Sequence, residues 1–173
     1  MDLGSQDIAT VTPDGHRLGA LIEGVNLRRA TTHPDERGEL TEIFNPAWGI
    51  LPEPAIYIYQ TMLRPRRIKG WVYHKLQHDR FFLTTGHLKI VLYDPRETSP
   101  TRGAVNEVFL TERNRGLLSI PPYVVHAVQN IGEIDAVWIN MPTVAYNHAE
   151  PDKIRVPLGA PEIPYSFDRG AGW

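Results

Sequence analysis

The sequence predicts an all-β fold in which many short strands form a barrel or a sandwich. Pro (15 residues) and Gly (14 residues) recur at short intervals along the chain. They separate runs in which apolar and polar residues alternate with a period of two, and no segment shows the 3.6-residue period of an amphipathic helix. The 173 residues are enough to bury one apolar core, so we expect a single domain spanning residues 1–173.

The alternation justifies the strands one by one. In the run 55–63, Gln60 falls on one face and Tyr59 on the other. In the run 87–94, every second residue is apolar, and we expect that face to point inward: Leu88, Ile90 and Leu92. One helical turn is expected near 147–153. The other predicted strands are, in chain order, 18–25, 38–44, 68–76, 79–85, 105–110, 116–120, 124–130 and 136–141.

The two ends of the chain are expected to be short arms, at about 1–15 and 160–173, around a barrel core of about 18–142. The closing segment 161–167 carries apolar residues, which we expect to pack on a neighbouring element or on a partner subunit. Because unpaired strand edges need cover, and because most soluble oligomers are symmetric dimers, the sequence favours a C2 homodimer.

The composition excludes several classes of function. The chain has no cysteine, so disulfides, thiol nucleophiles and cysteine-bound iron–sulfur clusters are ruled out. The formal net charge is −2, and without a long basic tract we expect neither a nucleic-acid nor a membrane partner. No apolar run approaches the roughly 18 residues of a membrane span, and the start does not resemble a signal peptide. A cytoplasmic location is expected.

Two motifs narrow the fold. The first is GWVYHKLQHD at 70–79, which contains His74 and Asp79, and the second is GLLSIPPYVVHAVQN at 116–130, which contains His126. Together they resemble the two motifs of the cupins, and this resemblance implies a double-stranded β-helix, or jelly-roll barrel. On strands that run as the pattern predicts, the three side chains point inward and converge in the mouth of the barrel.

Within the cupins, the chain resembles the dTDP-4-dehydrorhamnose 3,5-epimerase family of nucleotide-sugar enzymes. The matches include DERGELTE at 35–42, Lys69-Gly70, SPTRG at 99–103 and IPPYVVH at 120–126. The resemblance implies a small-molecule substrate, with a nucleotide-linked sugar as one candidate. It also implies substrate-binding roles for four residues: Arg37, Glu42, Gln60 and Lys69.

The sequence departs from the family where protons are transferred. Val72 stands in the position of the family's base His, and Asp79 replaces a Lys. The position of the family's general-acid Tyr falls near Ile139 or Asn140, whereas Tyr146 matches a second family Tyr. The family's C-terminal Asp has no clear counterpart. The resemblance therefore implies the family's scaffold and pocket walls with different proton-transfer groups.

Our first hypothesis is a divergent isomerase or epimerase acting beside a carbonyl group. His126 or His74 would be the base, Asp79 would orient it, and Tyr146 would supply an acid or hydrogen-bond donor. Lys69 or Arg37 would hold an anionic part of the substrate.

Two alternatives remain open. His74, Asp79 and His126 also form a set of two imidazoles and one carboxylate that suits a divalent transition metal, although the epimerase resemblance favours neither a metal nor another cofactor. The chain could also be a ligand-binding relative that has kept the barrel without the chemistry.

Overall fold

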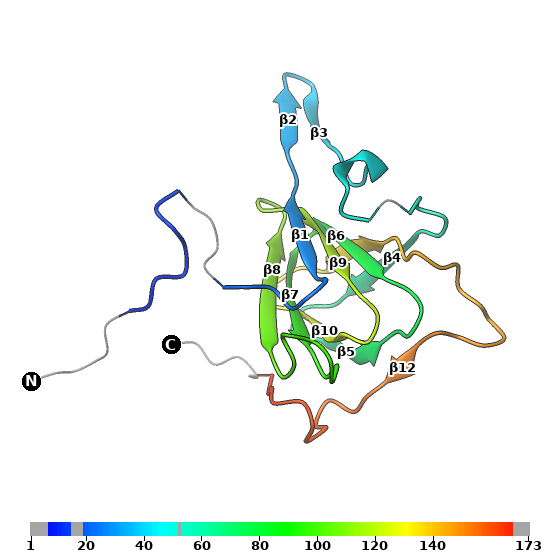
Figure 1. Ribbon diagram of the computed structural model, residues 1–173. Helices are drawn as coiled ribbons and strands as arrows, with labels where there is room; N and C mark the ends of the chain where they lie inside the picture. Colours follow the sequence, from blue (N-terminus) through cyan, green and yellow to red (C-terminus); the bar gives the residue numbers. More distant parts are fainter. Residues whose placement is uncertain (1–6, 15–18, 52, 168–173) are drawn as a thin grey trace, which may run out of the picture.

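The computed structural model describes residues 7–14, 19–51 and 53–167, and it confirms the all-β fold (Figure 1). The first five-stranded sheet has the order β1 (Asn26–Arg29), β9 (Gly116–Ile120), β6 (Asp79–Thr85), β11 (Ala136–Asn140) and β4 (Tyr59–Leu63). The second has the order β12 (Ile154–Arg155), β5 (Ile68–Tyr73), β10 (Val125–Asn130), β7 (His87–Tyr93) and β8 (Val105–Thr111). All strand pairs are antiparallel.

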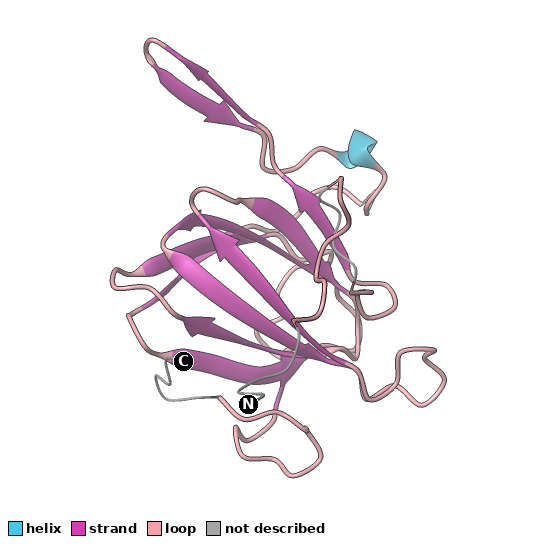
Figure 2. Cartoon of the chain, turned by 90° about the vertical axis from the view of Figure 1, so that its left-hand side faces the viewer, coloured by secondary structure: helices cyan, strands magenta, loops and turns pink. Residues whose placement is uncertain are grey.

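A separate hairpin of β2 (Thr32–Asp35) and β3 (Gly38–Thr41) projects from the barrel (Figures 1 and 2). It is followed by one short 3-10 helix, η1 (Pro46–Trp48), which Asn45 caps with its side chain. The described part of the chain holds no helix long and apolar enough to cross a membrane.

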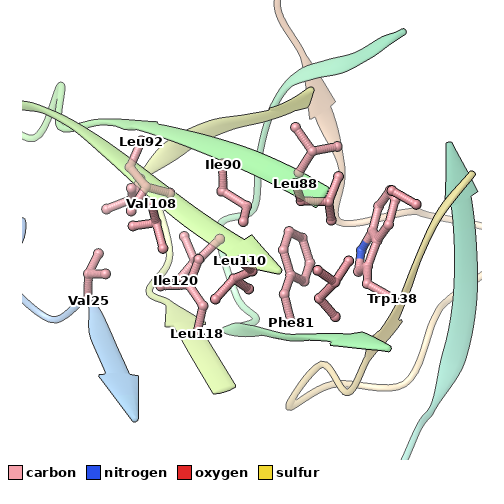
Figure 3. Close-up of a cluster of buried hydrophobic side chains, with 14 of the residues drawn as sticks. Val25, Phe81, Leu88, Ile90, Leu92, Val108, Leu110, Leu118, Ile120 and Trp138 are labelled. Carbon is pink, nitrogen blue, oxygen red and sulfur yellow. The ribbon is translucent and has the colours of Figure 1, made fainter. Parts of the chain in front are cut away.

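The apolar core lies between the two sheets (Figure 3). As the alternation predicts, Leu88, Ile90 and Leu92 of β7 are buried in it. Phe81 of β6 and Trp138 of β11 belong to this core and also line the main cavity. The core therefore forms part of the wall of the functional site, so packing and site geometry depend on each other.

The segment after β11 returns to the barrel and packs on the outer face of β5. Its residues Ile163, Tyr165 and Phe167 form a second apolar cluster around Trp71. The ring centroids of Tyr165 and Phe167 lie 6.0 Å and 5.3 Å from that of Trp71. The closing segment thus packs on its own chain, and β12, which precedes it in the sequence, pairs with β5.

Two sequence predictions are wrong. The strand expected at 18–25 is not formed over 19–25, where Gly24 (φ 81°) supports a turn closed by the Val25 N–H to Ile22 carbonyl bond; residue 18 lies outside the described residues. The helical turn expected at 147–153 is an irregular segment, since short side-chain and backbone bonds such as Ala149 N–H to Asn147 Oδ1 replace helical ones.

Candidate functional site

The main cavity opens between the two sheets and has a volume of about 100 Å³. Its lining combines an ionisable group, a set of cations, hydroxyl groups and apolar walls. The ionisable group is His74, Asp79 and His126; the cations are Lys69, Lys153 and Arg155; the hydroxyls are Tyr59 and Thr61; the apolar walls include Val72, Phe81, Val128 and Trp138.

The two imidazoles and the carboxylate meet at one atom. His74, Asp79 and His126 retain only 8%, 2% and 3% of their exposure. The Nε2 atoms of His74 and His126 each lie 3.2 Å from the same oxygen, Oδ2 of Asp79. His74 follows β5 and His126 lies on β10 in the second sheet, whereas Asp79 begins β6 in the first sheet, so the group spans both sheets.

The far side of each imidazole ring is held by the backbone. His126 Nδ1 lies 3.1 Å from the carbonyl oxygen of Val124, and His74 Nδ1 contacts the carbonyl oxygen of Asp152. Because a carbonyl oxygen can only accept, both Nδ1 atoms must carry a proton and donate it. The Nε2 atoms are therefore the ones that can exchange a proton or bind a cation.

Two amide side chains bind the other oxygen of Asp79. Gln77 Nε2 and Asn140 Nδ2 each donate to Oδ1 at 2.9 Å. The same Asn140 nitrogen donates to the hydroxyl oxygen of Tyr59 at 2.8 Å. The carboxylate is thus fixed by neutral donors on one oxygen and by imidazoles on the other.

Burial and hydrogen bonding compete in setting the charges of this group. Burial alone raises the pKa of Asp79, but its hydrogen bonds with His126 and His74 outweigh burial and hold the pKa well below its usual range. Burial lowers the pKa of His74, yet the hydrogen bond and the negative charge of Asp79 outweigh it, so the pKa of His74 is raised. Both pKa shifts therefore favour an ion pair between a protonated His74 and the Asp79 carboxylate.

Three cations from two adjacent strands line the same cavity. Lys69 lies on β5, whereas Lys153 and Arg155 lie at β12, which pairs with β5. Burial, together with the positive charges of Arg155 and Lys69, lowers the pKa of Lys153. Like charges gathered in one cavity favour an anionic ligand.

Asp152 fixes the segment that brings two of these cations to the cavity. Its carboxylate accepts hydrogen bonds from the backbone N–H groups of Lys75, Leu76 and Gln77 at 2.8, 2.8 and 3.1 Å. These bonds tie the start of β12 to the turn between β5 and β6. The same turn connects His74 to Asp79, so Asp152 also braces the ionisable group.

The structure places the other predicted site residues away from this cavity. Gln60 is exposed on the face of β4 opposite to Tyr59 and Thr61. Arg37 lies at the tip of the projecting hairpin, 2.6 Å from Asp35, and Glu42 is exposed directly after β3. Tyr146 is 43% exposed and packs against His148. Of the four predicted substrate-binding residues, Lys69 lines the cavity.

Sequence reasoning missed several residues of the site. The sequence motifs indicate no role for the polar supports Gln77 and Asp152, for the cations Lys153 and Arg155, or for Tyr59. A signal for Tyr59 was present, because strict alternation along 55–63 does not allow Tyr59 and Gln60 to face the same cavity.

Two five-stranded antiparallel sheets around an enclosed His–Asp–His group define this protein as a jelly-roll barrel of the cupin class. Residues 20–165 match the family model for dTDP-4-dehydrorhamnose 3,5-epimerase. The chain belongs to the dTDP-4-dehydrorhamnose 3,5-epimerase family, as its motifs predict.

Named relatives span most of the chain. The spore coat polysaccharide biosynthesis protein SpsL of Bacillus subtilis is 32% identical over 148 residues, which are 86% of this chain and 97% of SpsL. The probable low-salt glycan biosynthesis epimerase Agl13 of Haloferax volcanii is 31% identical over 79% of this chain and 88% of Agl13.

A solved structure gives the same result. The dTDP sugar isomerase of Desulfovibrio desulfuricans G20 is 32% identical, with a TM-score of 0.73 over 84% of this chain and 91% of that chain. The prediction of an isomerase- or epimerase-type enzyme of sugar biosynthesis is thereby confirmed.

Proposed function

We propose that this enzyme isomerises or epimerises a nucleotide-linked keto sugar by moving a proton at a carbon next to the carbonyl group. One observation carries the proposal: two buried Nε2 atoms lie 3.2 Å from the same Asp79 oxygen at a cavity. Both Nδ1 atoms are engaged by carbonyl oxygens, so proton exchange is confined to the cavity side of each ring.

The geometry supports His126 as the base. When His126 carries a proton only on Nδ1, its free Nε2 takes the proton from the carbon, and the electron pair of the C–H bond moves toward the carbonyl oxygen to form an enolate. The Asp79 carboxylate contacts the Nε2 atoms of both rings, so it holds His126 at the cavity while it pairs with His74. Delivery of a solvent proton to the opposite face of the carbon, while His126 releases its own proton to solvent, gives the epimer; return of the proton from His126 to another carbon gives an isomer.

The cation set supports a diphosphate-bearing substrate. Lys69, Lys153 and Arg155 line the cavity together with the ionisable group. Lys and Arg side chains are common ligands of phosphate groups, and the family is named for a dTDP-linked sugar. We place the sugar's keto group near His126 and the diphosphate at the three cations.

Deuterium wash-in tests this function directly. The protein is incubated in D2O with a panel of dTDP-linked 4-keto-6-deoxy sugars, and NMR records exchange beside the carbonyl. We expect His126→Ala to lower the exchange rate roughly 10²–10⁴-fold, while His87→Ala, an exposed His on β7, leaves it unchanged. Activity of His126→Ala near that of wild type contradicts the proposal. Tight binding without wash-in by the wild type favours a non-catalytic ligand-binding protein.

A second candidate, a metal-dependent enzyme, has its own supporting observation. One ligand atom from each of His74, Asp79 and His126 lies within 4.8 Å of the others, and each His donates its Nδ1 proton to a carbonyl, as metal-binding His residues do. A divalent metal there would polarise a carbonyl group. The three cations lining the same cavity oppose it. Elemental analysis of protein purified without chelators decides: a stoichiometric metal whose removal by EDTA abolishes activity favours this candidate.

We also propose a homodimer in the cytoplasm. Ile56, Ile58 and Met62 are exposed on one side of β4 and the segment leading into it, and β4 is the edge of its sheet, which supports a paired surface. Because Arg37 and Glu42 lie away from the cavity of their own subunit, they could contact substrate only in the cavity of the partner.

A mixture of Arg37→Ala and His126→Ala subunits should recover activity that neither variant has alone. Light scattering of the wild type tests the dimer itself.

A further inference from the structure

We infer that Tyr59 is the catalytic hydrogen-bond donor to the substrate's carbonyl oxygen. The inference rests on the proposed proton transfer and adds the group that stabilises its enolate. Removal of a proton beside a carbonyl places negative charge on the oxygen, and a donor aimed at that oxygen lowers the barrier. No such role for Tyr59 follows from the sequence motifs.

The position of Tyr59 is set by strand pairing. Tyr59 begins β4, where it pairs with Asn140 of β11 in the register of the first sheet. Its side chain lines the cavity together with Thr61, whereas Gln60 faces outward. The phenol therefore enters the cavity that contains His74, Asp79 and His126.

Asn140 determines which way the Tyr59 hydroxyl can donate. The side-chain Oδ1 of Asn140 accepts from the backbone N–H of Arg80 at 3.1 Å, which fixes the orientation of the side-chain amide. Its nitrogen then donates one proton to Asp79 Oδ1 at 2.9 Å and the other to Tyr59 Oη at 2.8 Å. Tyr59 Oη accepts a hydrogen bond from Asn140, so the hydroxyl proton of Tyr59 points away from Asn140. Because the Tyr59 ring lines the cavity, this proton is available to a substrate bound there.

The same network joins the donor to the base. Asn140 bridges Tyr59 and Asp79, and Asp79 contacts both imidazoles. A substrate with its acidic carbon at His126 and its carbonyl oxygen at Tyr59 would lie across this bridge. A donor that is hydrogen-bonded in advance loses little energy to reorganisation during the reaction.

The electrostatics keep Tyr59 in its donating form. Burial, together with the negative charge of Asp79, raises the pKa of Tyr59 to about 12. The phenol thus stays protonated through the neutral range. It shares its proton with the developing enolate oxygen and retains it when the carbonyl re-forms, so no proton is consumed in the cycle.

The experiment separates catalysis from binding. Tyr59→Phe removes the hydroxyl and keeps the ring. Tyr57→Phe is the matched control, because Tyr57 contacts the Tyr59 ring at 5.4 Å between centroids and does not line the cavity. We measure kcat and deuterium wash-in with the dTDP-linked 4-keto-6-deoxy sugar that the wild type turns over. Binding is measured with the corresponding 4-hydroxy sugar nucleotide, which has no keto group to enolise.

For Tyr59→Phe we expect kcat and wash-in to fall roughly 10²–10³-fold, with the Kd of the 4-hydroxy analogue within about threefold of wild type. Tyr57→Phe should match wild type in both. A Tyr59→Phe enzyme with kcat within threefold of wild type overturns the inference. Equal losses of binding and turnover also overturn it, because they assign Tyr59 to pocket shape. A wild type without wash-in refutes the proposed function and this role together.

Discussion

Asp79 and Arg80 are neighbours on β6 that place two buried charges on opposite faces of one strand. Asp79 keeps 2% of its exposure and Arg80 0%. Arg80 points away from the cavity and donates to three backbone carbonyls, those of Met141, Glu53 and Pro54, at 2.6, 2.7 and 3.2 Å. Phe44 packs on its guanidinium group, 4.6 Å from the ring centroid.

The partners of these two charges differ in kind. The guanidinium group of Arg80 donates to backbone carbonyl groups, which are neutral and do not titrate. Arg80 therefore serves to attach the 53–54 segment to the barrel. Asp79 has neutral partners on one oxygen only, and on the other it faces two imidazoles that can gain or lose protons. Burial alone therefore does not mark a functional charge; titratable partners beside a cavity do.

The largest expected effect comes from neutralising Asp79. Asp79→Asn keeps an oxygen for the bonds from Gln77 and Asn140 but removes the negative charge that contacts both imidazole rings. We expect kcat to fall roughly 10²–10⁴-fold with the fold retained, as measured by wash-in and circular dichroism. Asp94→Asn is the matched control, because Asp94 is equally buried but pairs with Arg96. An equal loss of kcat in both variants would contradict a special role for Asp79.

Removal of the Arg80 charge should have the opposite effect to Asp79→Asn: the free energy of unfolding should fall, whereas kcat should be retained. Arg80→Met leaves three carbonyl oxygens without their donor. Because one buried unpaired polar group costs about 1–3 kcal/mol, we expect the free energy of unfolding in urea to fall by roughly 3 kcal/mol or more. The kcat per folded molecule should stay within about twofold of wild type at low temperature. A catalytic loss as large as that of Asp79→Asn would remove the contrast between the two residues.

Much of the fold could be predicted because its signals are local. The strands expected at 79–85 and 116–120 agree with β6 and β9 to the residue. At Tyr123, the second motif replaces the usual Gly, yet the residue keeps the left-handed conformation (φ 64°) that the turn requires. The motif therefore predicts the backbone path even where its residue type is absent.

The sequence predicts only those site residues that belong to a motif with a recognisable spacing. His74, Asp79 and His126 were found because two motifs on paired strands bring them together. Lys153 and Arg155 were not, since β12 has only two residues and carries almost no pattern. Its position depends on contacts between distant segments, chiefly the Asp152 carboxylate and the packing of Ile163. Such contacts leave no periodic signal in the sequence.

The dependence of stability on pH sharpens the comparison of the two charges. The raised pKa of His74 contributes stability that is complete below the unfolded value of about 6.5 and is lost as pH rises through the folded pKa. The lowered pKa of Asp79 contributes stability above about 3.9, lost as pH falls. The stability difference between wild type and Asp79→Asn should therefore be larger at pH 5.5 than at pH 8.5.

Arg80 supplies the internal reference for this titration. A guanidinium group stays charged across the whole range, so the stability lost in Arg80→Met should be constant between those two pH values. Urea unfolding of the three proteins, each dialysed against EDTA, measures both differences. A constant difference for Asp79→Asn would show that the ion pair with His74 adds nothing to stability.

The smallest expected effect concerns Asp152, whose carboxylate accepts hydrogen bonds from three backbone N–H groups. Asp152→Ala leaves the N–H groups of Lys75, Leu76 and Gln77 without their acceptor, and since water can reach part of this turn, we expect a loss of roughly 1–2 kcal/mol in unfolding free energy. The β12 segment should detach locally, so the Val156 amide, which donates to the Trp71 carbonyl, should exchange its hydrogen faster. Asp152→Asn retains one acceptor oxygen and should show a smaller change in both. If the Val156 amide exchanges at the wild-type rate in Asp152→Ala, then the apolar packing of Ile163 and its neighbours holds β12 without the carboxylate.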